Sequence, residues 1–244
     1  MSQLFPHKRW ALPRCVGNEE LDHLAPDDPQ AVRSRQDLYR INRLMRSRAI
    51  IVQALSAMSS STPQHIVELG CGDGRIMLDV ARSLHRQWPK VHLTLLDQQA
   101  LVNEQTLQAL IDLGWQVKIV TQDVISWART NEAPVYDLIF CNLFIHHFKS
   151  RDLVTLLHAL SLRTQAFFAC EPRRARVPLL GSHLVGLIGA NAVTRSDAVL
   201  SVHAGFCDNE ISAAWHQSSP QQWRSKEYCA GLFSHCFLAM RESL

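Results

Sequence analysis

The chain has 244 residues, of which 47% are hydrophobic and 19% are charged, and its formal net charge is +3. This composition is ordinary for a globular protein and excludes a chain that is disordered over most of its length. The small net charge does not by itself indicate a nucleic-acid partner, and we expect none. A chain of this length is able to bury one α/β core with a closed pocket.

The apolar runs are no longer than strands, and residues 1–10 lack the apolar core of a signal peptide. We therefore expect a cytoplasmic protein without a membrane span. Seven cysteines without Cys-x-x-Cys spacing are typical of reduced thiols rather than of a disulfide framework. Residues 1–17, which mix prolines and a glycine with basic residues, are expected to form a loosely packed arm.

The first predicted element is one amphipathic helix over residues 29–58, because apolar residues recur there at three- and four-residue spacing. The helix is rich in arginine, at positions 33, 35, 40, 43, 46 and 48. Arginines grouped in this way along a helix usually form a face that is exposed to solvent. Two alternatives stay open: an arginine that meets the carboxylate of a cofactor, or a surface that docks an acidic carrier or substrate.

After residue 62, short apolar runs alternate with helical stretches, which predicts a parallel sheet built from βαβ units. The expected strands are residues 65–70, 91–97, 116–121, 136–142 and 165–171. The expected helices are residues 75–87, 99–112, 124–130 and 150–162. Two further runs, 223–229 and 234–241, flank a glycine-containing turn and predict an antiparallel hairpin.

The predicted fold is therefore a doubly wound, mostly parallel sheet of seven strands with an antiparallel last strand. We expect residues 1–62 to form an N-terminal arm and a helical cover. Residues 63–244 would form the main domain, with a helical insertion over about 173–222 after the fifth strand. The whole chain is expected to be one globular unit.

The most informative segment is residues 66–74, Ile-Val-Glu-Leu-Gly-Cys-Gly-Asp-Gly. Three alternate glycines after an apolar run allow a tight turn and let a ligand approach the backbone closely. Because a helix follows, its free N-terminal amides also face that ligand. Glu68 would repel a diphosphate, so the loop favours a ligand with a cationic or hydroxylated part.

Acidic residues end the next two strands. Asp97 lies where a carboxylate accepts hydrogen bonds from both ribose hydroxyls. Asp123 is placed to accept an adenine amino group, while Val124 packs against the ring. Asn142 and Leu143, after the fourth strand, would line the loop beneath a transferred group.

In order and spacing, Glu68, Gly70, Gly72, Gly74, Asp97, Asp123 and the strand Tyr136-Asp137-Leu138-Ile139 resemble the successive motifs of class I S-adenosylmethionine-dependent methyltransferases. The resemblance covers residues 64–172. It implies S-adenosylmethionine as the cofactor, bound by Glu68, Gly70, Cys71, Gly72, Gly74, Asp97, Gln98, Asp123, Val124, Asn142 and Leu143. A Rossmann dehydrogenase is the alternative with the most similar loop. In its fingerprint two residues separate the last two glycines, whereas one residue separates them here.

His146 and His147 follow the fourth strand, at the edge where open parallel sheets bind ligands. An imidazole there is able to accept the proton of a hydroxyl or phenol as it attacks a sulfonium methyl group. Because neighbouring side chains diverge, we expect only one of the two to face the pocket, and both could instead support the loop. Glu171 is a second candidate for the base or for a substrate anchor, unless it pairs with Arg173 or Arg174.

The acceptor is less defined than the cofactor. Apolar residues 178–190, together with residues 191–199 and 230–235, resemble methyltransferases of polyketide-type phenolic lipid and quinone pathways, and residues 178–190 would cap a hydrophobic pocket. The Asn-Pro-Pro-Tyr segment of amino-methyltransferases for DNA bases does not follow the fourth strand. His183, His203 and Cys207 lack metal-ligand spacing, so we expect no metal.

The expected function is O-methylation of a small hydroxylated or phenolic metabolite. C- or N-methylation, transfer of the cofactor's aminocarboxypropyl arm, and a regulatory protein that binds the cofactor without catalysis are the alternatives.

Overall fold

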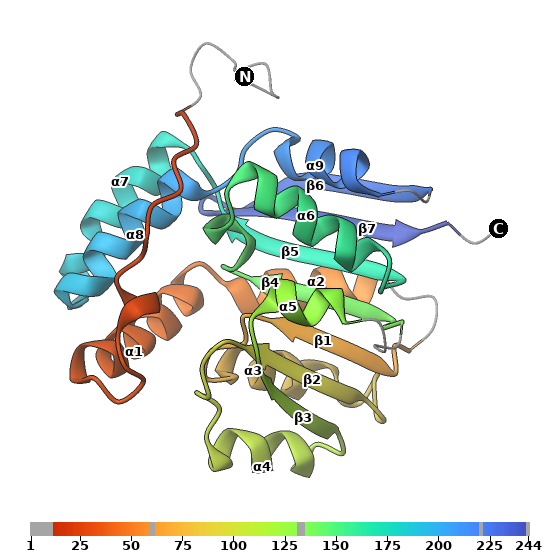
Figure 1. Ribbon diagram of the computed structural model, residues 1–244. Helices are drawn as coiled ribbons and strands as arrows, with labels where there is room; N and C mark the ends of the chain where they lie inside the picture. Colours follow the sequence, from red (N-terminus) through yellow and green to blue (C-terminus); the bar gives the residue numbers. More distant parts are fainter. Residues whose placement is uncertain (1–11, 59–61, 131–134, 220–221, 243–244) are drawn as a thin grey trace.

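The computed structural model describes residues 12–58, 62–130, 135–219 and 222–242. Its centre is a seven-stranded sheet in the order β3-β2-β1-β4-β5-β7-β6 (Figure 1). The strands are β1 (His65–Leu69), β2 (His92–Asp97), β3 (Gln116–Thr121), β4 (Leu138–Asn142), β5 (Ala166–Pro172), β6 (Trp223–Ala230) and β7 (Ser234–Arg241). β7 runs antiparallel to both of its neighbours, and the other pairs are parallel. The predicted fold class is confirmed.

Helices cover both faces of the sheet. One face packs against α2 (Ser47–Met58), α3 (Arg75–Leu84) and α4 (Glu104–Asp112). The other packs against α5 (Val124–Arg129), α6 (Ser150–Ser161) and α9 (Glu210–Ser218). Successive strand residues point to opposite faces, so Phe168 joins the first core while Phe167 stacks on Trp215 in the second, with ring centroids 5.1 Å apart.

The remaining helices form a cap beside the carboxyl ends of the parallel strands (Figure 1). This cap consists of α1 (Pro29–Leu44), α7 (Arg176–Leu184) and α8 (Ala192–Ala204), with short 3₁₀ turns η1 (Leu21–His23) and η3 (Val185–Ile188). The buried carboxylate of Asp37 accepts the backbone amide of Asn191 at 2.9 Å, and Ser34 donates to the Asn191 side chain at 3.0 Å. These bonds fasten α1 to the start of α8.

The single helix predicted over residues 29–58 is wrong, because α1 ends at Leu44 and α2 begins at Ser47. Arg46 between them has φ of 60°, the left-handed region, which breaks a right-handed helix. The two apolar faces serve different surfaces, since α1 packs in the cap and α2 on the sheet. The predicted helix at residue 99 also begins later, at Glu104, where the Asn103 side chain accepts the amide of Thr106.

The loosely packed arm expected over residues 1–17 is wrong for its described part, residues 12–17, and residues 1–11 lie outside the described residues. The amide of Cys15 donates to the carbonyl of His203 at 3.0 Å. The Arg14 guanidinium donates to the carbonyls of Ala204, His146 and Phe148. We call residues 12–24 the N-terminal strap, because they run across α8 to the start of α1 (Figure 1).

Among the described residues, no helix is both long enough and apolar enough to cross a bilayer.

Candidate active site

A cavity of about 380 Å³ lies where β1, β2 and β4 end, between the sheet and the cap. Its wall combines the glycine loop, the ends of these strands, α1, the N-terminal strap and the 3₁₀ turn η2 (Ile145–His147) that follows β4. Ten of the eleven residues expected to bind a cofactor line it: Glu68, Gly70, Cys71, Gly72, Asp97, Gln98, Asp123, Val124, Asn142 and Leu143. Gly74 does not line it and instead caps α3.

Two glycines of the loop serve different purposes. Both have positive φ, 65° at Gly70 and 54° at Gly72, which a residue with a Cβ adopts only with strain. A Cβ at Gly70 would lie 2.2 Å from the ring of Phe144, so this glycine lets the loop pack against the segment after β4. A Cβ at Gly72 would have no heavy atom within 4 Å, so this glycine leaves its backbone open to the cavity.

Asp97 connects the end of β2 to the glycine loop. Its Oδ2 accepts the amide of Gly72 at 2.8 Å, and its Oδ1 accepts the amide of Gln99 at 3.0 Å. Burial raises the pKa of Asp97 above its usual value, although both amide hydrogen bonds oppose that shift. The carboxylate therefore shapes the loop while it still borders the cavity.

Glu68 on β1 is a buried acidic residue in the wall with an unsatisfied oxygen. It is 3% exposed, and its Oε2 has no hydrogen-bond partner among the described residues. Burial, with the nearby carboxylates of Asp73 and Asp97, raises its pKa well above the usual range. Because an unpartnered buried carboxylate is costly, this end of the cavity favours a cationic hydrogen-bond donor.

Two further predicted residues lie at the ends of β3 and β4. Asp123 caps α5 by accepting the amide of Ser126 at 2.8 Å, and Val124 beside it is buried. The Asn142 amide donates to the Oδ1 of Asn42 on α1 at 3.1 Å. No sequence pattern indicated Asn42, because this residue lies within an arginine-rich segment that was predicted as a helical cover.

His146 is held between two carboxylates. It is 1% exposed, its Nδ1 lies 2.7 Å from Oε2 of Glu171, and its Nε2 lies 3.4 Å from Oε1 of Glu19. Burial alone would lower the pKa of His146, but the interactions with Glu171 and Glu19 outweigh it and raise the pKa to about 9. The same imidazole lowers the pKa of both carboxyl groups against the opposing effect of their burial.

Glu171 is fully buried and does not line the cavity. Besides His146, it accepts the backbone amides of Phe144 and Ile145, each at 3.1 Å from its Oε1. The pairing considered with Arg174 is not found, because Arg174 pairs with Glu210. The geometry places Glu171 behind His146, as a residue that orients the imidazole and the turn after β4.

The two histidines do not diverge as expected. Their ring centroids lie 4.2 Å apart, and both side chains line the cavity. His147 Nδ1 lies 3.2 Å from Oδ2 of Asp22, and the His147 side chain keeps 25% of its exposure. Both residues lie in the 3₁₀ turn η2, and each ring faces an acidic residue of the N-terminal strap, Glu19 for His146 and Asp22 for His147.

Glu19 and Asp22 complete this side of the site, and sequence reasoning missed both. They lie on the N-terminal strap, which α8 fixes in place: Asp197 accepts the amides of Glu20 and Leu21 at 2.9 and 3.0 Å. No local pattern indicates this contact, because it joins segments 177 and 176 residues apart.

Two other expectations concern the surroundings. None of residues 178–190 lines the cavity, so the predicted cap over a hydrophobic pocket is wrong for this cavity; Leu180 and Leu187 on that segment are exposed. Among the arginines, Arg33 and Arg40 pair with Asp37, and Arg35 lines the main cavity. The other three, Arg43, Arg46 and Arg48, line a second cavity that shares Asn42 and Ile76 with the first.

Comparison with known proteins agrees with this fold. Residues 66–163 match the family model described as a methyltransferase domain. No curated protein matches the sequence.

Solved structures match over most of the chain. The plantazolicin methyltransferase in complex with SAH has a TM-score of 0.61 at 13% identity, covering 88% of this chain and 92% of that chain. An O-methyltransferase family protein from Burkholderia thailandensis has a TM-score of 0.61 at 15% identity, and the match covers 89% of this chain and 62% of that chain. The mitomycin 7-O-methyltransferase has a TM-score of 0.61 at 17% identity, and the match covers 91% of this chain and 60% of that chain.

The chain thus spans less than two thirds of the latter two proteins, and at these identities the likeness shows the fold. The family match adds sequence similarity to a methyltransferase domain over residues 66–163. The chain therefore contains a segment that matches this methyltransferase family, within a fold that it shares with solved methyltransferases.

Proposed function

We propose that this methyltransferase binds S-adenosylmethionine in the cavity at the ends of β1, β2 and β4, and methylates an oxygen of a small hydroxylated or phenolic metabolite. One observation carries the proposal. The unsatisfied carboxylate of Glu68 and the carboxylate of Asp97 line the same cavity as the paired histidines His146 and His147.

The cavity wall fits this cofactor group by group. Its α-ammonium is the cationic donor that the buried Oε2 of Glu68 lacks. Gly72 leaves room for the methionine portion beside the backbone, where Gly70 and Cys71 also border the cavity. Asp97, with Gln98 next to it, is placed for the ribose hydroxyls.

The adenine would lie at the next strand end. Asp123 is placed to accept the adenine amino group, and the buried Val124 offers an apolar surface for the ring. Asn142 and Leu143 border the cavity between this region and the histidines. This placement leaves the histidine side of the cavity for the acceptor.

S-adenosylmethionine supplies a methyl group on a sulfonium centre. As the acceptor oxygen forms its bond to the methyl carbon, the bond between sulfur and that carbon breaks and its electron pair stays with sulfur. The chain must hold the acceptor in line and remove its hydroxyl proton. His146 and His147 are the imidazoles in the cavity wall, and Glu171 positions the first of them.

An oxygen acceptor agrees with the names of two of the structural neighbours, which are O-methyltransferases. The phenolic class rests on the resemblance of residues 178–199 and 230–235 to methyltransferases of phenolic lipid and quinone pathways. Because residues 178–190 do not line the cavity, they give no support for an apolar pocket there.

The proposal is tested with purified protein and S-adenosylmethionine labelled either in the methyl group or in the carboxyl group. Phenolic, catecholic and amine acceptors are supplied in separate reactions. We expect methyl label in a product that mass spectrometry identifies as an O-methyl ether. Carboxyl label in the product means aminocarboxypropyl transfer, and methyl label on carbon or nitrogen overturns the oxygen assignment. If the protein binds the cofactor but transfers no label to any acceptor, it is a cofactor-binding protein without catalysis, and the proposed reaction is wrong.

A further inference from the structure

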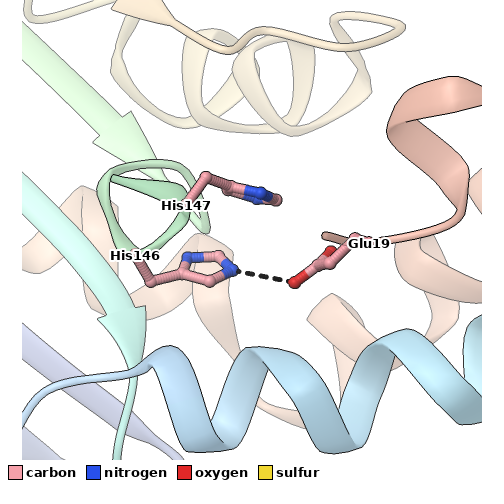
Figure 2. A group of neighbouring side chains, drawn as sticks. All are labelled: Glu19, His146 and His147. Atoms are coloured by element: carbon pink, nitrogen blue, oxygen red, sulfur yellow. Dashed lines mark ion pairs between the residues drawn. The ribbon is translucent and has the colours of Figure 1, made fainter. Parts of the chain in front are cut away.

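Three potential metal ligands converge on one side of the cavity. Glu19, His146 and His147 each offer a ligand atom, and these atoms lie within 4.8 Å of one another. Figure 2 shows both imidazole rings projecting from η2 toward Glu19 on the N-terminal strap. The rings and the carboxylate come from segments far apart in the chain, so the fold rather than the local sequence brings them together.

The spacing of His146 and Glu19 suits a shared ion better than a direct hydrogen bond. Nε2 of His146 is buried without a hydrogen-bond partner among the described residues, although Oε1 of Glu19 lies 3.4 Å away. Two ligands bound at about 2.1 Å with a tetrahedral angle at the metal lie roughly 3.4 Å apart. The buried nitrogen is therefore aimed at a position that a metal ion would fill.

The surroundings have the arrangement of an outer ligand shell. Nδ1 of His146 is hydrogen-bonded to Glu171 at 2.7 Å, which fixes the ring and points its Nε2 toward the cavity. A carboxylate behind a ligand histidine is the usual support of such ligands. Asp22 lies 3.2 Å from Nδ1 of His147, so three carboxylates surround two imidazoles and favour a cation.

We propose that Glu19, His146 and His147 bind one divalent transition-metal ion. Two imidazoles and one carboxylate suit zinc or ferrous iron and leave coordination positions open. Since all three residues line the cavity, those open positions face the space left for the acceptor. This role rests on the proposed function and refines it, because an imidazole nitrogen bound to the ion no longer accepts a proton: the ion would take the acceptor's hydroxyl oxygen as a ligand and ease loss of its proton.

Metal binding is tested without any methyl transfer. Protein stripped with a chelator is titrated with Co²⁺ alone, which reports its ligands by visible absorption, and with Zn²⁺ alone by calorimetry. We expect one ion per chain and a Co²⁺ spectrum of nitrogen and oxygen ligands. The Glu19→Gln and His147→Ala variants should each lose more than about 100-fold in affinity, which exceeds the roughly 10–100-fold effect of removing a residue that only supports a ligand.

Matched controls are Glu20→Gln and His183→Ala, which alter an exposed neighbour of Glu19 and an exposed histidine on α7. Both should bind the ions as the unaltered protein does. Circular dichroism confirms that each variant is folded. Equal affinity in all four variants, or no stoichiometric binding, overturns the site.

The outcome is separable from the proposed function. S-adenosylhomocysteine is titrated into the same metal-free protein. Metal bound at the cluster without this ligand in the cavity would refute the cofactor assignment and leave the metal site standing. Ligand binding with no metal affinity would refute the metal site alone, and the cluster would then be a hydrogen-bonded support for the imidazoles.

Discussion

The backbone amide of Gly72 donates a 2.8 Å hydrogen bond to the carboxylate of Asp97, which ties the open glycine of the loop to the end of the neighbouring strand. One carboxylate thus sets the loop conformation and borders the space where the ribose would lie. Loss of the Asp97 carboxylate should therefore change both the conformation of the glycine loop and the binding of a ribose.

Asp97→Ala should weaken binding of S-adenosylhomocysteine by about 1–3 kcal/mol, because a charged acceptor and its bond to Gly72 are both lost. Calorimetric titration measures the change. The control is Asp112→Ala, which removes an exposed carboxylate at the end of α4. Equal affinity in the two variants would place the ribose elsewhere.

Gly72→Ala and Gly231→Ala form a second matched pair. Both glycines have positive φ, 54° and 68°, and a Cβ at either would have no heavy atom within 4 Å. Each substitution should lower the free energy of unfolding by roughly 1–2 kcal/mol through backbone strain. Only Gly72→Ala should also weaken ligand binding, by tenfold or more, because its methyl group enters the cavity. If both variants bind alike, the ligand does not approach Gly72.

Cofactor binding should strengthen as pH rises, because of Glu68. Its pKa in the free protein is well above the usual range, so a proton must leave before the carboxylate pairs with an ammonium. The affinity gain should end once the pH exceeds that raised pKa. Calorimetry in buffers of different ionisation enthalpy should show proton release on binding. Proton uptake, or no exchange at all near neutral pH, would contradict this role of Glu68.

The stability of the free protein should depend on Glu68 in the opposite direction. Because the folded pKa lies above the unfolded one, the folded state holds more protons between the two values, and stability falls as pH rises through that window. Glu68→Gln should remove this loss and raise the melting temperature at neutral pH by about 2–4 °C, corresponding to about 1 kcal/mol. A lower melting temperature would mean that Glu68 is satisfied in the free protein.

Asp197→Ala should release the N-terminal strap from α8. The two amide bonds from Glu20 and Leu21 are lost, at a cost of about 1–3 kcal/mol. Hydrogen exchange should accelerate at these two amides while the strands keep their protection. The exposed Asp27→Ala serves as the control. Unchanged exchange would show that the strap is held without Asp197, by its other contacts such as those of Arg14 and Cys15.

Sequence patterns predicted the sheet and most of the residues that line the cavity at the strand ends because their signals are local. Glycines and acids at fixed distances from strand ends place the loop and Asp97 directly, and the alternation of apolar runs with helical stretches predicts a mostly parallel sheet. The break at Arg46 was missed because apolar spacing continues through it while the two helices face different surfaces.

The histidine side of the cavity was harder to predict, because it depends on contacts between distant segments. Arg14 bonds to the carbonyl of His146, 132 residues away, and thereby joins the N-terminal strap to the turn after β4. Residues 12–17 contain proline, glycine and charge, so their pattern indicated a loose arm. Glu19 therefore had no sequence signal that placed it beside the histidines.

Titration calorimetry of the unaltered protein with S-adenosylhomocysteine tests whether the cavity holds the cofactor. We expect one ligand per chain, bound with release of a proton from Glu68. A titration without heat in buffers of several ionisation enthalpies, at saturating concentrations of protein and ligand, would contradict it.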